Sequence, residues 1–360
     1  MKEGRPLMEI VQELEEIRRT AKDYKASSNK LAMAPTAKAL ILPTGKYDLT
    51  RHAETQLAEK LQIPAKFYDR LRDKHPDILA DTVNKLFQRE PGQHLVRTLP
   101  GKCRAILSPA YRIGLDNYSL AEAVLPQLKE VGAQIASINI TETRFYVKAL
   151  LPHLTHDLPL PPGLVMGRGH TFFVRKVIGA LTVQNSEVGM GSLQFLPGDF
   201  EEQCTNYASY KSEGLIKVHL GKKVAIEEEV AEYITDQTRA LDDAAFWSLA
   251  RDHVKALTDG RVFKKICERL VAARAQAIDG APEKVIEVFA EQHQLNEVEK
   301  GGLLKHLVGS GEMTQYGMHW ALTRLSQDVE DYDRATELER LGGQVIELPK
   351  KDWQVLAEAA

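Results

Sequence analysis

The sequence predicts an α+β fold: a central, mainly antiparallel sheet with a packed helix, a helical N-terminal segment and a helical C-terminal subdomain. Between residues 95 and 225, apolar and polar side chains alternate, which is the period of half-buried strands. Short turn sequences such as Pro100-Gly101 separate these runs and favour antiparallel neighbours. On either side of this region, apolar residues recur at helical spacing.

Four segments follow in chain order: an N-terminal helix and linker (1–44), a helical segment (45–94), the α+β sheet core (95–225) and a helical C-terminal region (226–360). The first helix covers 7–25, and the linker after it holds a short strand at 39–42. No internal repeat with a fixed period is visible.

The first helix of the helical segment begins near Thr50. Either Thr50 or Asp48 is a suitable N-cap. Pro64 interrupts the apolar pattern, which then continues in helical rhythm. Two short helices around residues 61–64 resemble a helix-turn-helix, although helical hairpins that only pack are far commoner. Both interpretations stay open.

In the sheet core, strands are expected over 95–99, 103–107, 134–140 and 142–149, with a helix over 120–130 capped within residues 116–119. The proline-rich residues 152–162 predict a surface loop. Further strands are expected over 171–183, 192–196 and 215–220. This unit should form one sheet.

The C-terminal region should contain several helices. Pro282 suits the first turn of one of them, and Thr314 suits the N-cap of a long one. Leu325 should be buried on that long helix, Gly342-Gly343 should end it, and a last strand is expected at 345–348.

Composition is that of a soluble globular protein, with 43% hydrophobic and 27% charged residues. No apolar run approaches the roughly 18–20 residues that span a bilayer, so no membrane partner is expected. The three widely spaced cysteines, Cys103, Cys204 and Cys267, argue against a disulfide framework or a four-cysteine zinc site. A cytoplasmic location is therefore expected.

Charge is distributed unevenly along the chain. Residues 1–94 carry 17 Lys and Arg against 14 Asp and Glu, and residues 95–225 carry 14 against 10. Residues 226–360 carry 16 against 26. A mildly basic middle beside an acidic C-terminal region is compatible with binding of a polyanion in the middle.

The stretch from Glu142 to Lys148 alternates most clearly. Thr143, Phe145 and Val147 should point into the core. The side chains of Arg144, Tyr146 and Lys148 should form an outer face. A basic, aromatic, basic face suits a phosphate backbone with a base stacked between the charges. The alternative is an ordinary solvated sheet face.

Other basic and aromatic residues of the sheet core extend this candidate surface. Lys and Arg release counterions from phosphates, and aromatic rings stack on bases. The full set of candidate nucleic-acid-binding residues is Lys102, Arg104, Tyr111, Arg112, Arg144, Tyr146, Lys148, Arg168, Arg175, Lys176 and Lys217.

Motifs for other chemistry are absent or weak. No phosphate-binding loop of the Gly-x-x-x-x-Gly-Lys-Ser/Thr type occurs. His153, His156 and Asp157 are close in sequence, but they lack the one-turn helical spacing of a zinc site. Ser108 lacks the setting of a hydrolase nucleophile. We therefore predict no catalytic residue, no metal and no cofactor.

Three groups of residues carry a family resemblance. Arg104–Arg112 reads Arg-Ala-Ile-Leu-Ser-Pro-Ala-Tyr-Arg and is followed by Asp116-Asn117; Asn185–Ser192 reads Asn-Ser-Glu-Val-Gly-Met-Gly-Ser; Tyr332–Ala335 reads Tyr-Asp-Arg-Ala. They resemble the phage and plasmid protein family known as domain of unknown function 932, over roughly residues 45–350. The resemblance implies a role in DNA metabolism without a known reaction. The order of strands and helix is also similar to single-strand annealing recombinases, as an analogy of fold.

Together these observations favour a protein that binds single-stranded DNA, could promote annealing or recombination, and performs no covalent chemistry. A homo-oligomer is plausible, because weak sites gain from multivalency. One alternative is an enzyme acting on nucleic acid or a nucleotide, with a site near 167–170 and 185–192. Another is a scaffold or inhibitor that binds a host protein through its acidic helices.

Overall fold

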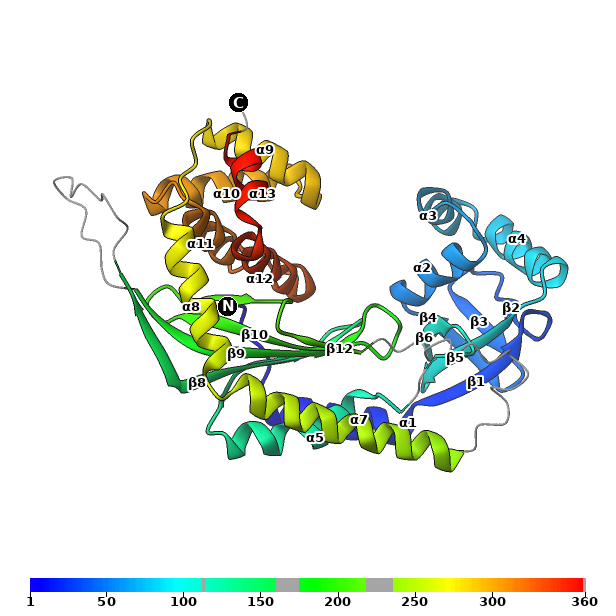
Figure 1. Ribbon diagram of the computed structural model, residues 1–360. Helices are drawn as coiled ribbons and strands as arrows, with labels where there is room; N and C mark the ends of the chain where they lie inside the picture. The colour runs from blue at the N-terminus through cyan, green and yellow to red at the C-terminus, as the bar shows by residue number, and fades with distance from the viewer. Residues whose placement is uncertain (112–113, 160–174, 218–235, 359–360) are drawn as a thin grey trace.

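The computed structural model describes residues 1–111, 114–159, 175–217 and 236–358. It has an α+β fold with helices at both ends of the chain, and its strands form two sheets rather than the single expected one. Each sheet carries its own helices (Figure 1).

The first sheet has the strand order β1-β5-β6-β4-β3-β2. Its strands are β1 (Lys22–Ser27), β2 (Ala32–Met33), β3 (Ala39–Leu42), β4 (Gly45–Leu49), β5 (Gln93–Leu99) and β6 (Lys102–Leu107). A short 3-10 helix, η1 (Ser28–Lys30), follows β1. All pairs are antiparallel except β4 with β6. We call residues 22–107 the N-terminal unit.

Three helices cover the first sheet: α2 (Arg51–Lys60), α3 (Ala65–Lys74) and α4 (Pro76–Arg89). Thr50 caps α2 as expected, its hydroxyl accepting from the Ala53 amide. The core includes Leu57, Leu71 and Phe87 from these helices. The strand expected at 39–42 is β3, but β1 and β2 also join the sheet, so the stretch before residue 44 is part of the N-terminal unit rather than a linker.

The second sheet has the order β11-β10-β9-β8-β7, and β12 also pairs with β10. Its strands are β7 (Gln134–Ile140), β8 (Phe145–Leu158), β9 (Arg175–Asn185), β10 (Leu193–Glu201), β11 (Asn206–Ser209) and β12 (Leu215–Lys217). Every pair is antiparallel. Residues 152–158, expected in a loop, continue β8, and Pro159 follows the strand. Residues 160–162 of that predicted loop lie outside the described residues.

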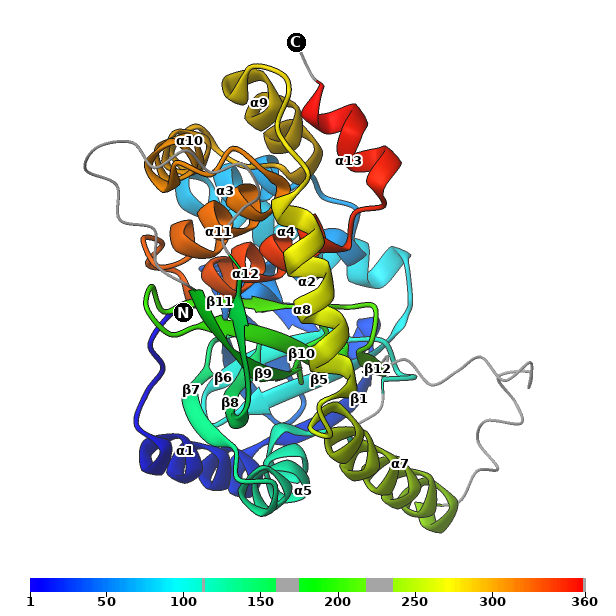
Figure 2. The ribbon, with the colours of Figure 1, turned by 60° about the vertical axis from the view of Figure 1, so that its left-hand side comes forward.

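The second sheet is covered on both faces. On one side lie α1 (Leu7–Thr20), α5 (Asn117–Glu130) and α7 (Asp236–Leu257), whose apolar residues pack on Phe145 and Val147. On the other lie α8 (Arg261–Arg274), α11 (Gln315–Leu325) and α12 (Tyr332–Glu347). Figure 2 shows the same layers from a second direction.

The outer C-terminal helices are α9 (Pro282–His293), α10 (Glu297–Ser310) and α13 (Lys350–Ala357), which share a core with α11 and α12. Leu325 is buried there, as expected. Gly342 and Gly343 lie inside α12 rather than at its end, and residues 345–347 are helical. A Cβ at Gly343 would overlap the Ser209 carbonyl oxygen, so glycine lets α12 approach β11 closely.

Helix caps explain several boundaries, and one offers a simple test. The Thr314 hydroxyl accepts a hydrogen bond from the Gly317 amide at 3.1 Å. Thr314→Ala should lower the free energy of unfolding by about 1 kcal/mol, because one amide of the first turn of α11 loses its partner. Thermal unfolding followed by tryptophan fluorescence checks this. Thr314→Ser should behave like the parent, and equal stability of the alanine variant would show that the cap is dispensable.

Candidate nucleic-acid interface

The face of β8 that carries Tyr146 and Lys148 is not exposed. Tyr146 and Lys148 are 1% and 0% exposed, because residues of α12 pack on this face. The Lys148 ammonium donates to the Glu339 carboxylate at 2.5 Å and to the Thr336 hydroxyl at 3.0 Å. The expectation of an outer basic face was therefore wrong for these two residues.

Tyr146 is held between layers and is unavailable for stacking on a base. Its ring centroid lies 5.2 Å from that of Tyr332 on α12. Burial of the phenol raises the pKa of Tyr146 above its ordinary value. Arg144 differs from its neighbours, because its side chain keeps 27% of its exposure while its Nε donates to the Met190 carbonyl.

Arg104 and Tyr111 are also buried, and they join the two sheets. Both contact residues Asn185–Ser192, which we call the junction loop, between β9 and β10. The Arg104 guanidinium lies 3.0 Å from the Glu187 carboxylate, and the Tyr111 hydroxyl donates to the Ser186 carbonyl at 2.5 Å. With 9% and 8% exposure, Arg104 and Tyr111 do not belong to the outer sheet surface that was predicted to bind nucleic acid.

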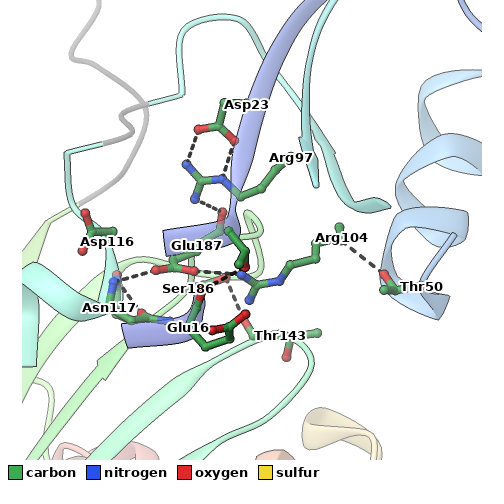
Figure 3. A network of polar contacts seen from close by, with 12 residues as sticks. Glu16, Asp23, Thr50, Arg97, Arg104, Asp116, Asn117, Thr143, Ser186 and Glu187 are labelled. Atoms are coloured by element: carbon green, nitrogen blue, oxygen red, sulfur yellow. Dashed lines mark hydrogen bonds and ion pairs between the residues drawn. The ribbon is translucent and has the colours of Figure 1, made fainter. Parts of the chain in front are cut away.

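Glu187 is the centre of the polar network in Figure 3. Its second carboxylate oxygen accepts from the Asn117 amide at 2.7 Å. Its main-chain carbonyl accepts from Arg97, which also forms an ion pair with Asp23 at 2.8 Å. Two of the motifs that carry the family resemblance, 104–117 and 185–192, therefore meet here.

The helix α2 is bound to the same loop. The Gln56 side chain donates to the Val188 carbonyl at 2.7 Å, and a ring nitrogen of His52 lies 2.7 Å from the same oxygen. Gly189 has a φ of +81°, and a Cβ there would lie 2.7 Å from a Leu107 methyl carbon. Glycine thus allows the loop to approach β6.

The remaining candidates are scattered. Arg175 is largely buried and forms an ion pair with Glu201 at 3.0 Å, whereas Lys176 is more exposed and lies 3.4 Å from Glu202. The Lys217 ammonium lies 5.4 Å from the centroid of the Phe246 ring. Lys102 is exposed at the β5–β6 turn. Arg112 and Arg168 lie outside the described residues.

The clearest exposed basic surface is one that the sequence prediction missed. Lys66, Phe67, Arg70 and Lys74 lie within one face of α3, at helical spacing, and we call them the α3 basic face. All four are exposed, and Phe67 is 51% exposed. Lys66, Arg70 and Lys74 form no ion pair with any residue that the structure describes.

The charge of the N-terminal unit explains why this surface was missed. Residues 22–107 carry 16 Lys and Arg against 9 Asp and Glu. The sequence count over 1–94 included α1, whose glutamates belong to the layer under the second sheet. Leaving out residues 1–21 raises the excess of cations from three to four, and including Arg97, Lys102 and Arg104 of β5 and β6 raises it to seven.

Next to α2 lies an open hollow of about 510 Å³. Its lining comes from α2, the end of β6 and the junction loop, and includes Lys60, Ser108 and Ser192. Partial burial of the Lys60 ammonium lowers the pKa of this lysine. The hollow therefore combines a partly desolvated cation with hydroxyl groups.

Metal-ligating side chains do not gather in the described part of the chain: no group of three His, Cys, Asp or Glu is placed to hold an ion. His153 and His156 both lie on β8. Across the same residues, no helix combines the length and apolar character needed to cross a membrane.

A scan against protein-family models, a search of curated proteins and a search of solved structures each returned no match to this chain. The resemblance to the phage and plasmid family therefore stays a prediction. Function has to be inferred from the residues themselves.

Proposed function

We propose that the protein binds single-stranded nucleic acid through the N-terminal unit, with the α3 basic face as its main contact. The observation that carries this proposal is the exposed face of Lys66, Phe67, Arg70 and Lys74, whose three cations have no acidic partner among the described residues. Free cations can replace the counterions of a phosphate backbone.

Phe67 favours a single strand over a duplex. An exposed phenylalanine is costly to leave in water, and a base can stack on its ring only when that base is unpaired and splayed out. Lys66 and Arg70 flank Phe67 on the same helix. This is the basic, aromatic, basic arrangement expected from β8, placed instead on a helix.

The acidic C-terminal helices direct the strand to the N-terminal unit. Residues 275–360 carry 8 Lys and Arg against 16 Asp and Glu. Figure 1 shows that α9–α13 rise on the same side of the molecule as α2–α4 and stand apart from them. Like charges would repel phosphates from the first group and leave α3 as the favoured contact.

A role in DNA metabolism, including strand annealing or recombination, is the biological setting that the family resemblance implies. Binding without base-specific contacts would suit annealing, because the bases stay available for pairing. Assembly into a homo-oligomer would strengthen a weak site by multivalency.

The proposal is tested by fluorescence anisotropy with a labelled oligonucleotide at several salt concentrations. Replacing Lys66, Arg70 and Lys74 together by alanine should weaken binding and flatten the salt slope by about 2, at about 0.7 per phosphate contact. Phe67→Ala should weaken binding by about 1–3 kcal/mol with the slope unchanged, because it removes stacking alone.

The matched control removes three exposed lysines from the C-terminal helices, Lys305, Lys350 and Lys351. It makes the same change in net charge and should leave the slope unchanged. Parent-like affinity and slope in the α3 variants would remove α3 as the contact. Tighter binding of the matching duplex than of the single strand would contradict the role given to Phe67.

A further inference from the structure

The hollow beside α2 lies where the two sheets meet. Its walls are the C-terminal part of α2, the end of β6 and the junction loop. Residues of the N-terminal unit and of the second sheet's junction loop therefore face the same hollow. This placement is maintained by the bonds of His52 and Gln56 to the Val188 carbonyl.

One cation lines the hollow, and a second lies close to one of its lining residues. Lys60 lines it from α2. Arg144 precedes β8 and is not a lining residue, but its Nε lies 3.7 Å from where a Cβ would stand on the lining residue Gly191. The guanidinium keeps part of its exposure, although it lies 3.9 Å from Asp333. A singly charged phosphate group could be held by the Lys60 ammonium.

One wall of the hollow is apolar and is formed by Ile106, Leu107 and Tyr111. These residues line the hollow with apolar and aromatic atoms. A volume of about 510 Å³ lies in the range of small-ligand sites, which combine apolar walls with a few polar groups. A planar base fits such a wall, with Ser108 and Ser192 available as hydrogen-bond partners.

The hollow suits one phosphate rather than several. Glu59 also lines it, and a carboxylate would repel a triphosphate more strongly than a phosphodiester. Lys60 ends α2, and Lys66 lies in the first turn of α3, so only a short turn separates the hollow from the α3 basic face. A strand on α3 can therefore reach the hollow.

We propose that the hollow takes one nucleotide of the bound strand, with the base against Ile106, Leu107 and Tyr111 and the phosphate on the Lys60 ammonium. This inference rests on the proposed binding of single strands. It adds a site at which a single unpaired nucleotide is held in a hollow, whereas α3 offers an exposed helix face.

The experiment uses the full chain and an oligodeoxynucleotide that contains 2-aminopurine, whose fluorescence reports the surroundings of a base. Ser192→Phe fills the hollow, and Lys60→Gln removes its cation. Ser192→Phe should weaken strand binding about tenfold, as expected for loss of one enclosed base, and should abolish the fluorescence change. Lys60→Gln should flatten the salt slope by about 0.7, and Lys60→Arg should restore it.

Lys46→Gln is the matched control, because Lys46 is exposed on β4 of the same unit. Calorimetric titration with free dAMP and dCMP forms a separate arm. Ser192→Phe and Lys60→Gln could leave strand binding unchanged while the α3 variants still weaken it. That result would contradict the nucleotide site in the hollow and leave the proposed function intact. Binding of free mononucleotide with no effect of these variants on the strand would also overturn it, and would assign the hollow to a free nucleotide.

Discussion

Glu339→Leu should lower the free energy of unfolding by about 3–5 kcal/mol, because it leaves the Lys148 ammonium buried without its carboxylate. Lys148 would keep the Thr336 hydroxyl and the rings of Tyr332 and Tyr207, whose centroids lie 4.8 Å and 5.6 Å from its ammonium. The three tryptophans, Trp247, Trp320 and Trp353, all lie outside the N-terminal unit. Their fluorescence during urea unfolding therefore reports the layer in which this pair lies.

The double variant Lys148→Met with Glu339→Leu tests whether the loss of stability comes from the unpaired charge. It replaces both charges with apolar groups and should recover most of the lost stability. Removal of the exposed pair Asp81 and Lys85 should cost about 0.5 kcal/mol or less, since both side chains are solvated. A double variant no more stable than Glu339→Leu would show that the pair contributes more than charge compensation.

Glu187→Ala should cost about 3–5 kcal/mol as well, since it leaves the Arg104 guanidinium buried and uncompensated and removes the partner of the Asn117 amide. The loss should appear as weaker coupling between the two sheets. Urea midpoints from tryptophan fluorescence and from far-ultraviolet circular dichroism should move further apart than in the parent, because only the second signal includes the N-terminal unit.

Glu202→Ala is the control for this variant. Its carboxylate forms an exposed ion pair with Lys176 and should contribute less than about 1 kcal/mol. If Glu187→Ala shifts both midpoints equally, the network stabilises the fold as a whole and does not couple the sheets specifically.

Local features of the fold could be predicted from the sequence. Thr50, Asp116 and Thr314 cap the helices that their residue types favour, and Pro282 lies in the first turn of α9. These signals act over a few residues. The alternation at Phe145 and Val147 likewise gave the correct face for the core beneath β8.

Strand partners could not be predicted in the same way. Alternation assigns each side chain to a face, but it does not say which edge a strand will join. β5 and β6 therefore looked like members of the later sheet, although they pair with β1 and β4.

Burial of Lys148 could not be predicted because its partner is remote. A lysine on a strand ordinarily indicates a solvated face, and Glu339 lies 191 residues further along the chain. For α3 a local signal existed: Lys66, Arg70 and Lys74 recur every fourth residue. This signal was missed because charges were counted over residues 1–94, which combine α1 with only part of the N-terminal unit.

The position of α1 has a consequence for the order in which the chain folds. The strands and helices of the N-terminal unit find all their sheet partners within residues 22–107, so this unit can form as soon as those residues leave the ribosome. Ile10 and Leu14 of α1 instead pack with α5 and α7, more than a hundred residues later. During synthesis the apolar side of α1 therefore stays exposed until α5 and α7 have been made. The N-terminal unit, although encoded after α1, can fold before that. Such delayed long-range closure slows folding and gives chaperones a defined early target.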